Sequence, residues 1–217
     1  MDELSFNLYE NQIFALLGHN GAGKTTTINM LTGLFPPDTD SGDSTIYGAG
    51  VLNNMGDVRK TLGVCPQHDV LFDQLTCKEH IVFFSLLKGN TKIWTHAANE
   101  AKQLLDHFHL HERSNYVGSE LSGGMKRKLS TAIAICGGSK FIVLDEPTAG
   151  MDPLARRELW DLLKVSAFLP FYLSTSLPLC LSPCLPLSPL VAGWSLPFLS
   201  HYTLHTLAAC ICRHSLL

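Results

Sequence analysis

A glycine-rich segment near the start of the chain has the clearest chemical meaning. Residues 18–25 follow the spacing G-x-x-x-x-G-K-T, after an apolar run and before a segment able to form a helix. Glycines in such a loop let successive backbone N–H groups point at phosphate oxygens, and the helix N-terminus favours negative charge there. Lys24 is expected to reach the β- and γ-phosphates, and the Thr25 hydroxyl is expected to bind Mg²⁺. The candidate nucleotide-binding residues are Gly18, His19, Asn20, Gly21, Ala22, Gly23, Lys24, Thr25 and Thr26.

Two acidic residues stand at the end of a second apolar run. Residues 141–144 read Phe-Ile-Val-Leu and are followed by Asp145 and Glu146. A carboxylate at the C-terminal end of a buried strand beside a phosphate loop is suited to hold Mg²⁺, so Asp145 is the candidate ligand, directly or through water. Glu146 is the candidate catalytic base that accepts a proton from the attacking water. The alternative, an acidic pair that only ends a strand at the surface, is disfavoured by the phosphate loop upstream.

A third motif adds a second glycine-rich helix start. Its residues are Leu121, Ser122, Gly123, Gly124 and Met125, followed by Lys-Arg-Lys-Leu-Ser. Ser122 is a suitable N-cap, and Leu129, Ile133 and Cys136 follow at helical spacing. Two glycines at a helix start leave backbone N–H groups uncovered, which makes a second anion site. One chain therefore carries two candidate phosphate-binding helix ends.

Taken together, these motifs resemble the nucleotide-binding domain of an ABC transporter. The wording is most similar to subfamily A, the eukaryotic lipid exporters, in the runs Leu-Leu-Gly-His-Asn-Gly-Ala-Gly-Lys-Thr-Thr, Leu-Thr-Gly-Leu-Phe-Pro-Pro, Cys-Pro-Gln-His-Asp-Val-Leu-Phe-Asp and Leu-Ser-Gly-Gly-Met-Lys-Arg-Lys-Leu-Ser. The resemblance covers residues 4–164. It implies an ATPase that uses ATP and Mg²⁺ and works at the cytoplasmic face of a membrane as part of a transporter.

The resemblance also implies roles and partners. Gln67 matches the Q-loop glutamine that contacts Mg²⁺ and water and couples to the membrane helices, and Asp152 lies in a D-loop. ATP is held between two such domains arranged head-to-tail, so that residues 121–125 and Asp152 serve the opposite site. The implied partners are a second nucleotide-binding domain and transmembrane domains.

Hydrophobic periodicity supplies the elements that must position these residues. Residues 13–17 are expected to form a buried parallel strand, and helices are expected over 79–88 and 94–108. Asp152 with Pro153 favours a helix start. The predicted fold class is α/β, a P-loop NTPase core with a mixed sheet formed by residues 1–69 and 138–164. An ABC-type helical subdomain, facing the partner domain and the membrane part, is expected over about 70–137.

Composition excludes several other classes. The chain has 217 residues, 46% hydrophobic and 16% charged, with a net charge of −3. These values argue against a collagen-like chain, a coiled coil, a wholly disordered chain and a nucleic-acid partner. Three cysteines in patterned segments are expected to be reduced core residues, and the tail cysteines match no zinc spacing. Histidines 80, 96, 107, 109 and 111 are expected to be exposed or to cap helices rather than bind metal.

The last part of the chain has a different composition. Residues 165–217 are rich in Leu, Ser and Pro, and Arg213 is their one charged residue. The prolines oppose a membrane-spanning helix, and no strand or helix period persists, so we expect no regular structure there. Because Val165-Ser166 reads as a splice donor in frame, our hypothesis is a translated intron or a mis-predicted exon end. The alternative is a genuine disordered tail. Genomic DNA across codon 165 separates the two.

The resemblance has gaps at both ends. The family's adenine-stacking aromatic and first strands lie well before the phosphate loop, whereas Gly18 is close to Met1. The family's switch histidine has no match, because the corresponding run Leu173-Ser-Thr-Ser176 has none. We therefore expect a truncated domain that binds ATP weakly and hydrolyses it poorly. Two alternatives are a catalytically weak fragment that transports nothing and a soluble ABC-type ATPase of DNA repair or translation.

Overall fold

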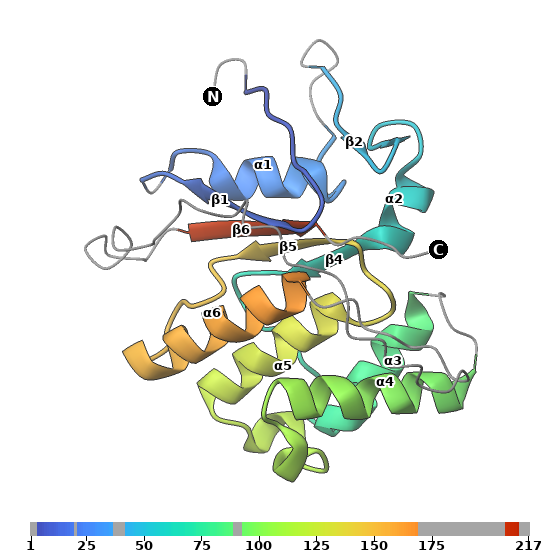
Figure 1. The fold of residues 1–217 in the computed structure, drawn as a ribbon, viewed down its shortest axis with the longest axis vertical. Coiled ribbons are helices and arrows are strands. Elements are labelled where there is room, and N and C mark those ends of the chain that lie inside the picture. The colour runs from blue at the N-terminus through green and yellow to red at the C-terminus, as the bar shows by residue number, and fades with distance from the viewer. Residues whose placement is uncertain (1–3, 20, 37–41, 89–92, 169–206, 213–217) are drawn as a thin grey trace, which may run out of the picture.

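The computed structural model describes residues 4–19, 21–36, 42–88, 93–168 and 207–212 (Figure 1). In chain order its elements are β1 (Gln12–Leu17), α1 (Lys24–Leu31), β2 (Thr45–Ile46), β3 (Ala49–Gly50), α2 (Met55–Thr61), β4 (Leu62–Cys65), α3 (Cys77–Leu87), α4 (Trp94–His107), η1 (His111–Arg113), η2 (Gly118–Glu120), α5 (Gly123–Ile135), β5 (Phe141–Asp145), α6 (Pro153–Phe168) and β6 (Leu207–Cys212).

A four-stranded sheet in the order β1-β6-β5-β4 forms the centre of the molecule. Figure 1 shows α1 on one side of this sheet and α5 and α6 on the other. β4 pairs with β5 in parallel, whereas β6 is antiparallel to both of its neighbours. The sheet is therefore mixed, as predicted. In the parallel pair Cys65 lies opposite Leu144, so the segments that follow both strands leave the same edge of the sheet side by side.

β5 is the buried strand that its apolar run predicts. All five of its residues are buried. Phe141 and Val143 belong to the hydrophobic cluster that includes Ile28 of α1, whereas Ile142 and Leu144 belong to the cluster of α3 to α6. Successive side chains of a strand point to opposite faces. The two faces of β5 therefore pack into the two hydrophobic clusters, and Asp145 is the last residue of this strand.

β1 differs from the buried parallel strand that we expected. It is antiparallel to β6, it is the end member of the described sheet, and Leu17 is 63% exposed. Phe14 and Leu16 pack against one cluster and Ile13 against the other, so burial is partial. A short apolar run fits a central strand and an end strand equally well, which is why the sequence did not separate them.

The tail also differs from expectation at two places. Residues 165–168 continue α6, and residues 207–212 form β6, which is paired with β1 on one side and β5 on the other. The run Leu-Ala-Ala-Cys-Ile-Cys has no proline, so each backbone N–H can join a strand ladder. The expectation of no regular structure is thus not met at residues 207–212. The remaining tail residues lie outside the described part, and the intron hypothesis stays a prediction about the gene.

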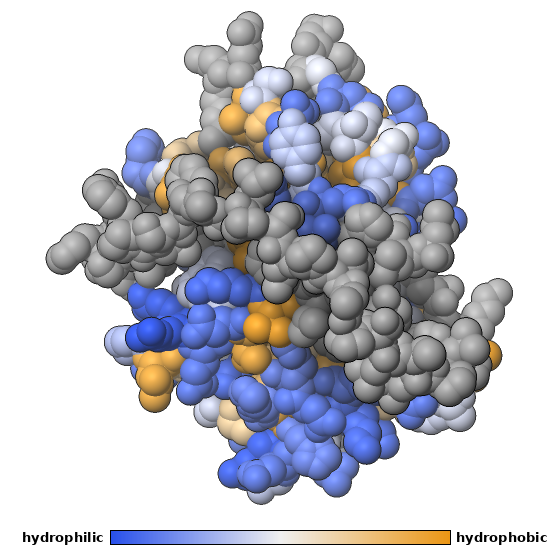
Figure 2. Space-filling view, in the orientation of Figure 1, coloured by the Kyte–Doolittle hydropathy of each residue, from blue (hydrophilic) through white to orange (hydrophobic). Residues whose placement is uncertain are grey.

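The helices follow the expected periods closely. α3 and α4 match the helices predicted over 79–88 and 94–108. α3 begins earlier, at Cys77, because the Thr76 side chain accepts a bond from Glu79 N and the Glu79 carboxylate accepts one from Thr76 N, a capping box that the expected boundary did not use. Within the residues that the structure describes, no helix is both long enough and apolar enough to cross a membrane. Figure 2 shows a mostly hydrophilic surface over the helices α4 to α6.

The core cysteines confirm the prediction made for them. Cys65, Cys77 and Cys136 are free and fully buried. Burial raises the pKa of the Cys136 thiol to about 12, so the thiol stays protonated at neutral pH. These residues act as small apolar side chains of the core.

Candidate functional site

The phosphate-loop motif forms an open turn that leads into α1. Gly23 is the N-cap with a φ of 88°, a left-handed conformation that glycine adopts without steric cost, and it has no side chain to cap the first turn. Gly21 also has a positive φ of 80°, and a side chain built there would meet open space. The first backbone N–H groups of α1 therefore remain available to an anion. Asn20 lies outside the described residues.

Lys24 is held inside this loop. Its side chain is buried, and its Nζ donates to the carbonyl oxygens of Gly18 at 2.8 Å and His19 at 2.9 Å. The loop carbonyls thus satisfy the buried ammonium group. A phosphate is a stronger acceptor than a neutral carbonyl because its bond to the ammonium is between two charges.

Gln67 and Glu146 meet across the mouth of the loop. Gln67 Nε2 donates to Glu146 Oε2 at 2.9 Å, although the two residues are far apart in the chain. The parallel register of β4 and β5 explains the meeting, because the segments after Cys65 and Asp145 leave the sheet together. A cavity of about 410 Å³ lies here, and the residues that line it are Gly21, Gly23, Lys24, Thr25, Thr26, Gln67 and Glu146.

The composition of this pocket fits a nucleotide phosphate with Mg²⁺. Lys24 and the open helix start supply positive charge, whereas Thr25, Gln67 and Glu146 supply hydroxyl, amide and carboxylate oxygens. Such hard oxygen ligands are those that Mg²⁺ prefers. Asp145 ends β5 next to the pocket and is 5% exposed, without being one of the lining residues.

Glu146 has an unusual backbone. Its φ is 44°, in the left-handed region that few non-glycine residues adopt. Conformations of this kind cost free energy and persist where surrounding contacts fix them, often at functional sites. Glu146 directly follows β5, and with this backbone conformation it lines the pocket.

The second glycine-rich helix start lies away from this pocket. Ser122 caps α5 as predicted, with its Oγ accepting from Met125 N at 3.4 Å. Gly123 faces open space, and a side chain built at Gly124 would meet Met151 at 3.9 Å, so the end of α5 lies beside the segment of Asp152. Leu121 is buried under this end.

The predicted cap at Asp152 is also present. Its Oδ2 accepts from Ala155 N at 3.1 Å at the start of α6. None of the residues 121–125 and 152 lines the cavity at the phosphate loop. The structure thus divides the predicted site residues into two groups on one chain.

One of the histidines, His80, differs from the exposed or capping ring that was expected, whereas His111 is exposed as expected. His80 is fully buried: Nε2 accepts from Phe72 N at 2.9 Å, Nδ1 donates to Thr76 O at 2.8 Å, and burial lowers the pKa of the ring. His111 has a carboxylate partner, Asp106, at 2.7 Å. Within the described ranges, no group of three or more His, Cys, Asp and Glu side chains could hold a metal ion.

Arg127 is a buried residue beside the site that the sequence motifs did not single out. It lies one turn into α5 and is 3% exposed, with its guanidinium between the two segments that carry Gln67 and Glu146. A signal existed: Arg127 shares a helix face with Thr131 and Ala134, both buried, three to four residues apart. An arginine on a buried face must have several hydrogen-bond acceptors.

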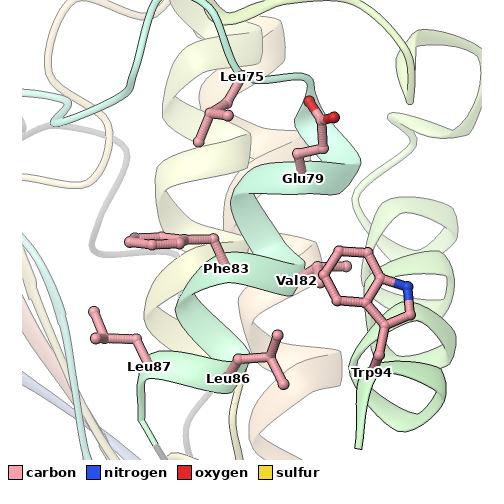
Figure 3. Close-up of a pocket in the computed structure, with 7 residues that line it drawn as sticks. All are labelled: Leu75, Glu79, Val82, Phe83, Leu86, Leu87 and Trp94. Atoms are coloured by element: carbon pink, nitrogen blue, oxygen red, sulfur yellow. The ribbon is translucent and has the colours of Figure 1, made fainter.

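A second cavity, of about 460 Å³, lies on the helices rather than at the phosphate loop (Figure 3). Phe83 and Leu87 of α3 are 43% and 66% exposed, and Trp94 at the start of α4 is 63% exposed. The lining residues are Leu75, Glu79, Val82, Phe83, Leu86, Leu87 and Trp94. Large exposed apolar patches are typical of protein contacts, membrane contacts and ligand-binding grooves.

Comparison with known proteins decides the family. The sequence profile of the family described as "ABC transporter" matches residues 1–149. The chain belongs to the ABC transporter family. "ATP-binding cassette sub-family A member 2" of Rattus norvegicus is 54% identical over 163 residues, which are 75% of this chain and 6% of that protein. "Phospholipid-transporting ATPase ABCA3" of Homo sapiens is 53% identical over 162 residues, which are 75% of this chain and 9% of that protein.

These relatives confirm the resemblance to subfamily A. The chain spans less than a tenth of the length of either relative. Solved structures confirm the α/β P-loop fold. "Structure of ATP binding subunit of ABC transporter" has a TM-score of 0.59 and 29% identity, covering 70% of this chain and 61% of that one. A dimeric ATP-binding cassette bound to ADP and Pi has a TM-score of 0.59 at 22% identity, covering 66% of this chain and 65% of that one, and supports the fold alone.

Proposed function

We propose that this chain is the ATP-binding and ATP-hydrolysing module of a sub-family A transporter that exports lipid. One observation carries the proposal: the hydrogen-bonded pair Gln67 and Glu146 lines the same pocket as Lys24 and Thr25 of the phosphate loop. The name of the relative ABCA3, a phospholipid-transporting ATPase, supports lipid as the cargo.

Each lining residue has a role in this proposal. Lys24 and the N–H groups of the loop hold the triphosphate, and Thr25, Gln67 and Asp145 hold Mg²⁺. Bound Mg²⁺ neutralises charge on the phosphate oxygens. Glu146 accepts a proton from the attacking water, and the Gln67 amide that now binds Glu146 orients that water.

A second domain completes the site. Ser122, Gly123 and Gly124 offer backbone N–H groups at the start of α5, away from the chain's own pocket. In a head-to-tail pair these groups contact the γ-phosphate on the other domain, with Asp152 beside them. One chain supplies two half-sites and completes neither alone.

Slow turnover of the isolated chain is the second candidate. In this state ATP-site motifs remain, but the Glu146 carboxylate is occupied by Gln67, and Lys24 is bonded to its own loop. A vigorous phosphate-release rate that depends on Lys24 would reject slow turnover. Absence of ATP binding would reject both candidates.

The apolar pocket on α3 is the proposed contact with the transmembrane domains, at the cytoplasmic face of the membrane. Its exposed aromatic side chains, Phe83 and Trp94, suit an apolar helix end (Figure 3). Phe83→Glu should weaken co-purification with the transmembrane part, measured on co-expressed chains. Leu154→Glu is the matched control because Leu154 is 69% exposed on α6. Equal loss in both variants would reject this contact.

ATP binding tests the core of the proposal. Titration with a fluorescent ATP analogue and Mg²⁺ should give saturable binding that ATP displaces and EDTA weakens. Lys24→Ala should weaken this binding. A Lys24→Ala chain that binds the analogue as tightly as the unaltered chain would contradict the assignment of the pocket.

A further inference from the structure

Arg127 is a buried charge with an unusually complete set of acceptors. Its side chain is 3% exposed, and it lies one turn into α5, whose N-cap is Ser122. A buried charge is costly unless hydrogen bonds satisfy it. A guanidinium carries five N–H donors in a fixed plane, so its acceptors identify the segments that it holds together.

One part of the guanidinium holds the turn after β5. Nε donates to Pro147 O at 2.9 Å, and Nη2 donates to Asp145 O at 2.6 Å and Glu146 O at 2.8 Å. These bonds bracket Glu146, whose left-handed φ of 44° requires surrounding contacts to persist. Arg127 therefore fixes the strained backbone that carries the Glu146 carboxylate into the pocket.

The other part of the guanidinium holds the segment after β4. Nη1 donates to Pro66 O at 2.6 Å, to Gln67 O at 3.2 Å and to Asp69 Oδ1 at 3.1 Å. The Asp69 side chain is only 23% exposed, so water screens this ion pair weakly. One rigid group thus binds both segments whose side chains meet at the pocket.

We propose that Arg127 is the positioning residue that holds Gln67 and Glu146 next to each other. It does not line the pocket, and it acts through the backbone of both partners. The parallel register of β4 and β5 brings the two segments together, and Arg127 holds them where the 2.9 Å bond between their side chains can form. Arg127 lies on α5, and the start of this helix at Ser122 is the proposed contact with a second domain. The same helix therefore also sets the geometry of the chain's own pocket. The catalytic consequence rests on the proposed function, whereas the linkage itself does not.

Amide hydrogen exchange without nucleotide tests the linkage. Arg127→Met removes every donor and keeps an unbranched side chain, and Arg127→Lys keeps the charge without the planar fork. Lys128→Met is the matched control, since Lys128 is the next residue of α5 and pairs with Glu158 of α6 at 3.0 Å, with the two side chains 14% and 46% exposed. In both Arg127 variants exchange should rise about tenfold at the backbone amides of residues 67–69 and of residues 145, 146 and 148 together, with α1 and α4 within about twofold.

Three results would overturn the proposal: unchanged exchange, loosening of one segment without the other, or a uniform rise throughout the chain, which marks a merely structural role. Arg127→Lys with exchange like that of the unaltered chain would also overturn it, because a point charge would then suffice. A rise confined to both segments in both Arg127 variants, absent in Lys128→Met, supports it.

Steady-state phosphate release tests the catalytic consequence. Arg127→Met should lower kcat about tenfold with ATP affinity within about threefold, because loop geometry rather than phosphate contact changes. The Arg127→Met/Glu146→Gln double variant should be no slower than Glu146→Gln alone, since both changes act on one step. Additive losses would reject action through Glu146. If the unaltered chain neither binds nor hydrolyses ATP, the proposed function fails, and the exchange experiment still decides the role of Arg127.

Discussion

The helix starts at α1 and α5 share backbone chemistry but differ in their surroundings. At α1, Gly23 leaves the first turn without a side-chain cap, and Lys24 lies within the loop. At α5, Ser122 caps Met125 N, and Gly123 faces open space. Only the α1 end shares a pocket with Gln67 and Glu146 among the described residues. In the proposed function both helix starts contact phosphate, and only the α1 end lies beside side chains that could carry out chemistry.

The largest expected effect is a loss of catalysis at the α1 end. Glu146→Gln should lower kcat by about 100-fold or more, because general-base catalysis is lost, while ATP affinity changes little. The glutamine oxygen can still accept the bond from Gln67 Nε2, so the geometry is preserved. Phosphate release against ATP concentration is the measurement. An unchanged kcat would show that Glu146 takes no proton and would remove the chemical difference between the ends.

Charge at the first helix end is the next test. Lys24→Ala should weaken ATP binding about 10- to 100-fold, because a hydrogen bond between charged groups contributes about 1.5–3 kcal/mol. Lys126→Ala, one residue past the α5 motif, should change single-chain binding less than about twofold, as expected for a charge away from the ligand. Titration of both variants with a fluorescent ATP analogue compares them. Equal losses would contradict the assignment of the pocket to the α1 end.

Negative charge at the second helix end should affect association alone. Gly124→Asp has room, since a Cβ atom at this position would lie 3.9 Å from its nearest neighbour, the Met151 side chain. Repulsion of a γ-phosphate should weaken ATP-driven dimerisation about tenfold, as like charges at close range cost on the order of 1 kcal/mol or more. Sedimentation with and without ATP measures it. Gly56→Asp, in an open position on α2, is the control. Loss of ATP binding by the single Gly124→Asp chain would count against the division of roles.

The smallest effect concerns the cap of α5. Ser122→Ala should lower the free energy of unfolding by about 1 kcal/mol, as for the loss of an N-cap acceptor. Ser122→Asp should retain that stability and still weaken ATP-driven dimerisation through its charge. Urea unfolding together with sedimentation separates the cap from the phosphate contact. If Ser122→Asp dimerised like the unaltered chain, the α5 end would not face phosphate.

Local signals in the sequence predicted the parts that local chemistry controls. The glycine spacing around Lys24 predicted the loop and α1, and Ser122 predicted the start of α5. The apolar run that ends at Asp145 predicted a buried strand, and the structure places one face of it in each half of the core. The resemblance carried by these motifs supplied the family and the fold.

What the sequence missed depends on contacts between distant segments. The Gln67–Glu146 bond follows from the parallel register of two strands, which no single segment contains. The six acceptors of Arg127 come from two segments far from it in the chain. The placement of β6 beside β1 also depends on tertiary contacts, because a short apolar run does not specify the strands with which it will pair.

Mixing two defective chains tests the division between the helix ends most directly. Lys24→Ala weakens the α1 end of one chain and Gly124→Asp weakens the α5 end of the other, so each variant alone should dimerise with ATP and Mg²⁺ at least about tenfold more weakly than the unaltered chain. In the mixture one composite site is intact, formed by Lys24 of one chain and the α5 start of the other. The account predicts that ATP restores association in the mixture, measured by sedimentation, with one bound nucleotide per pair. A mixture that stays monomeric, while the unaltered chain dimerises with ATP, would contradict the account.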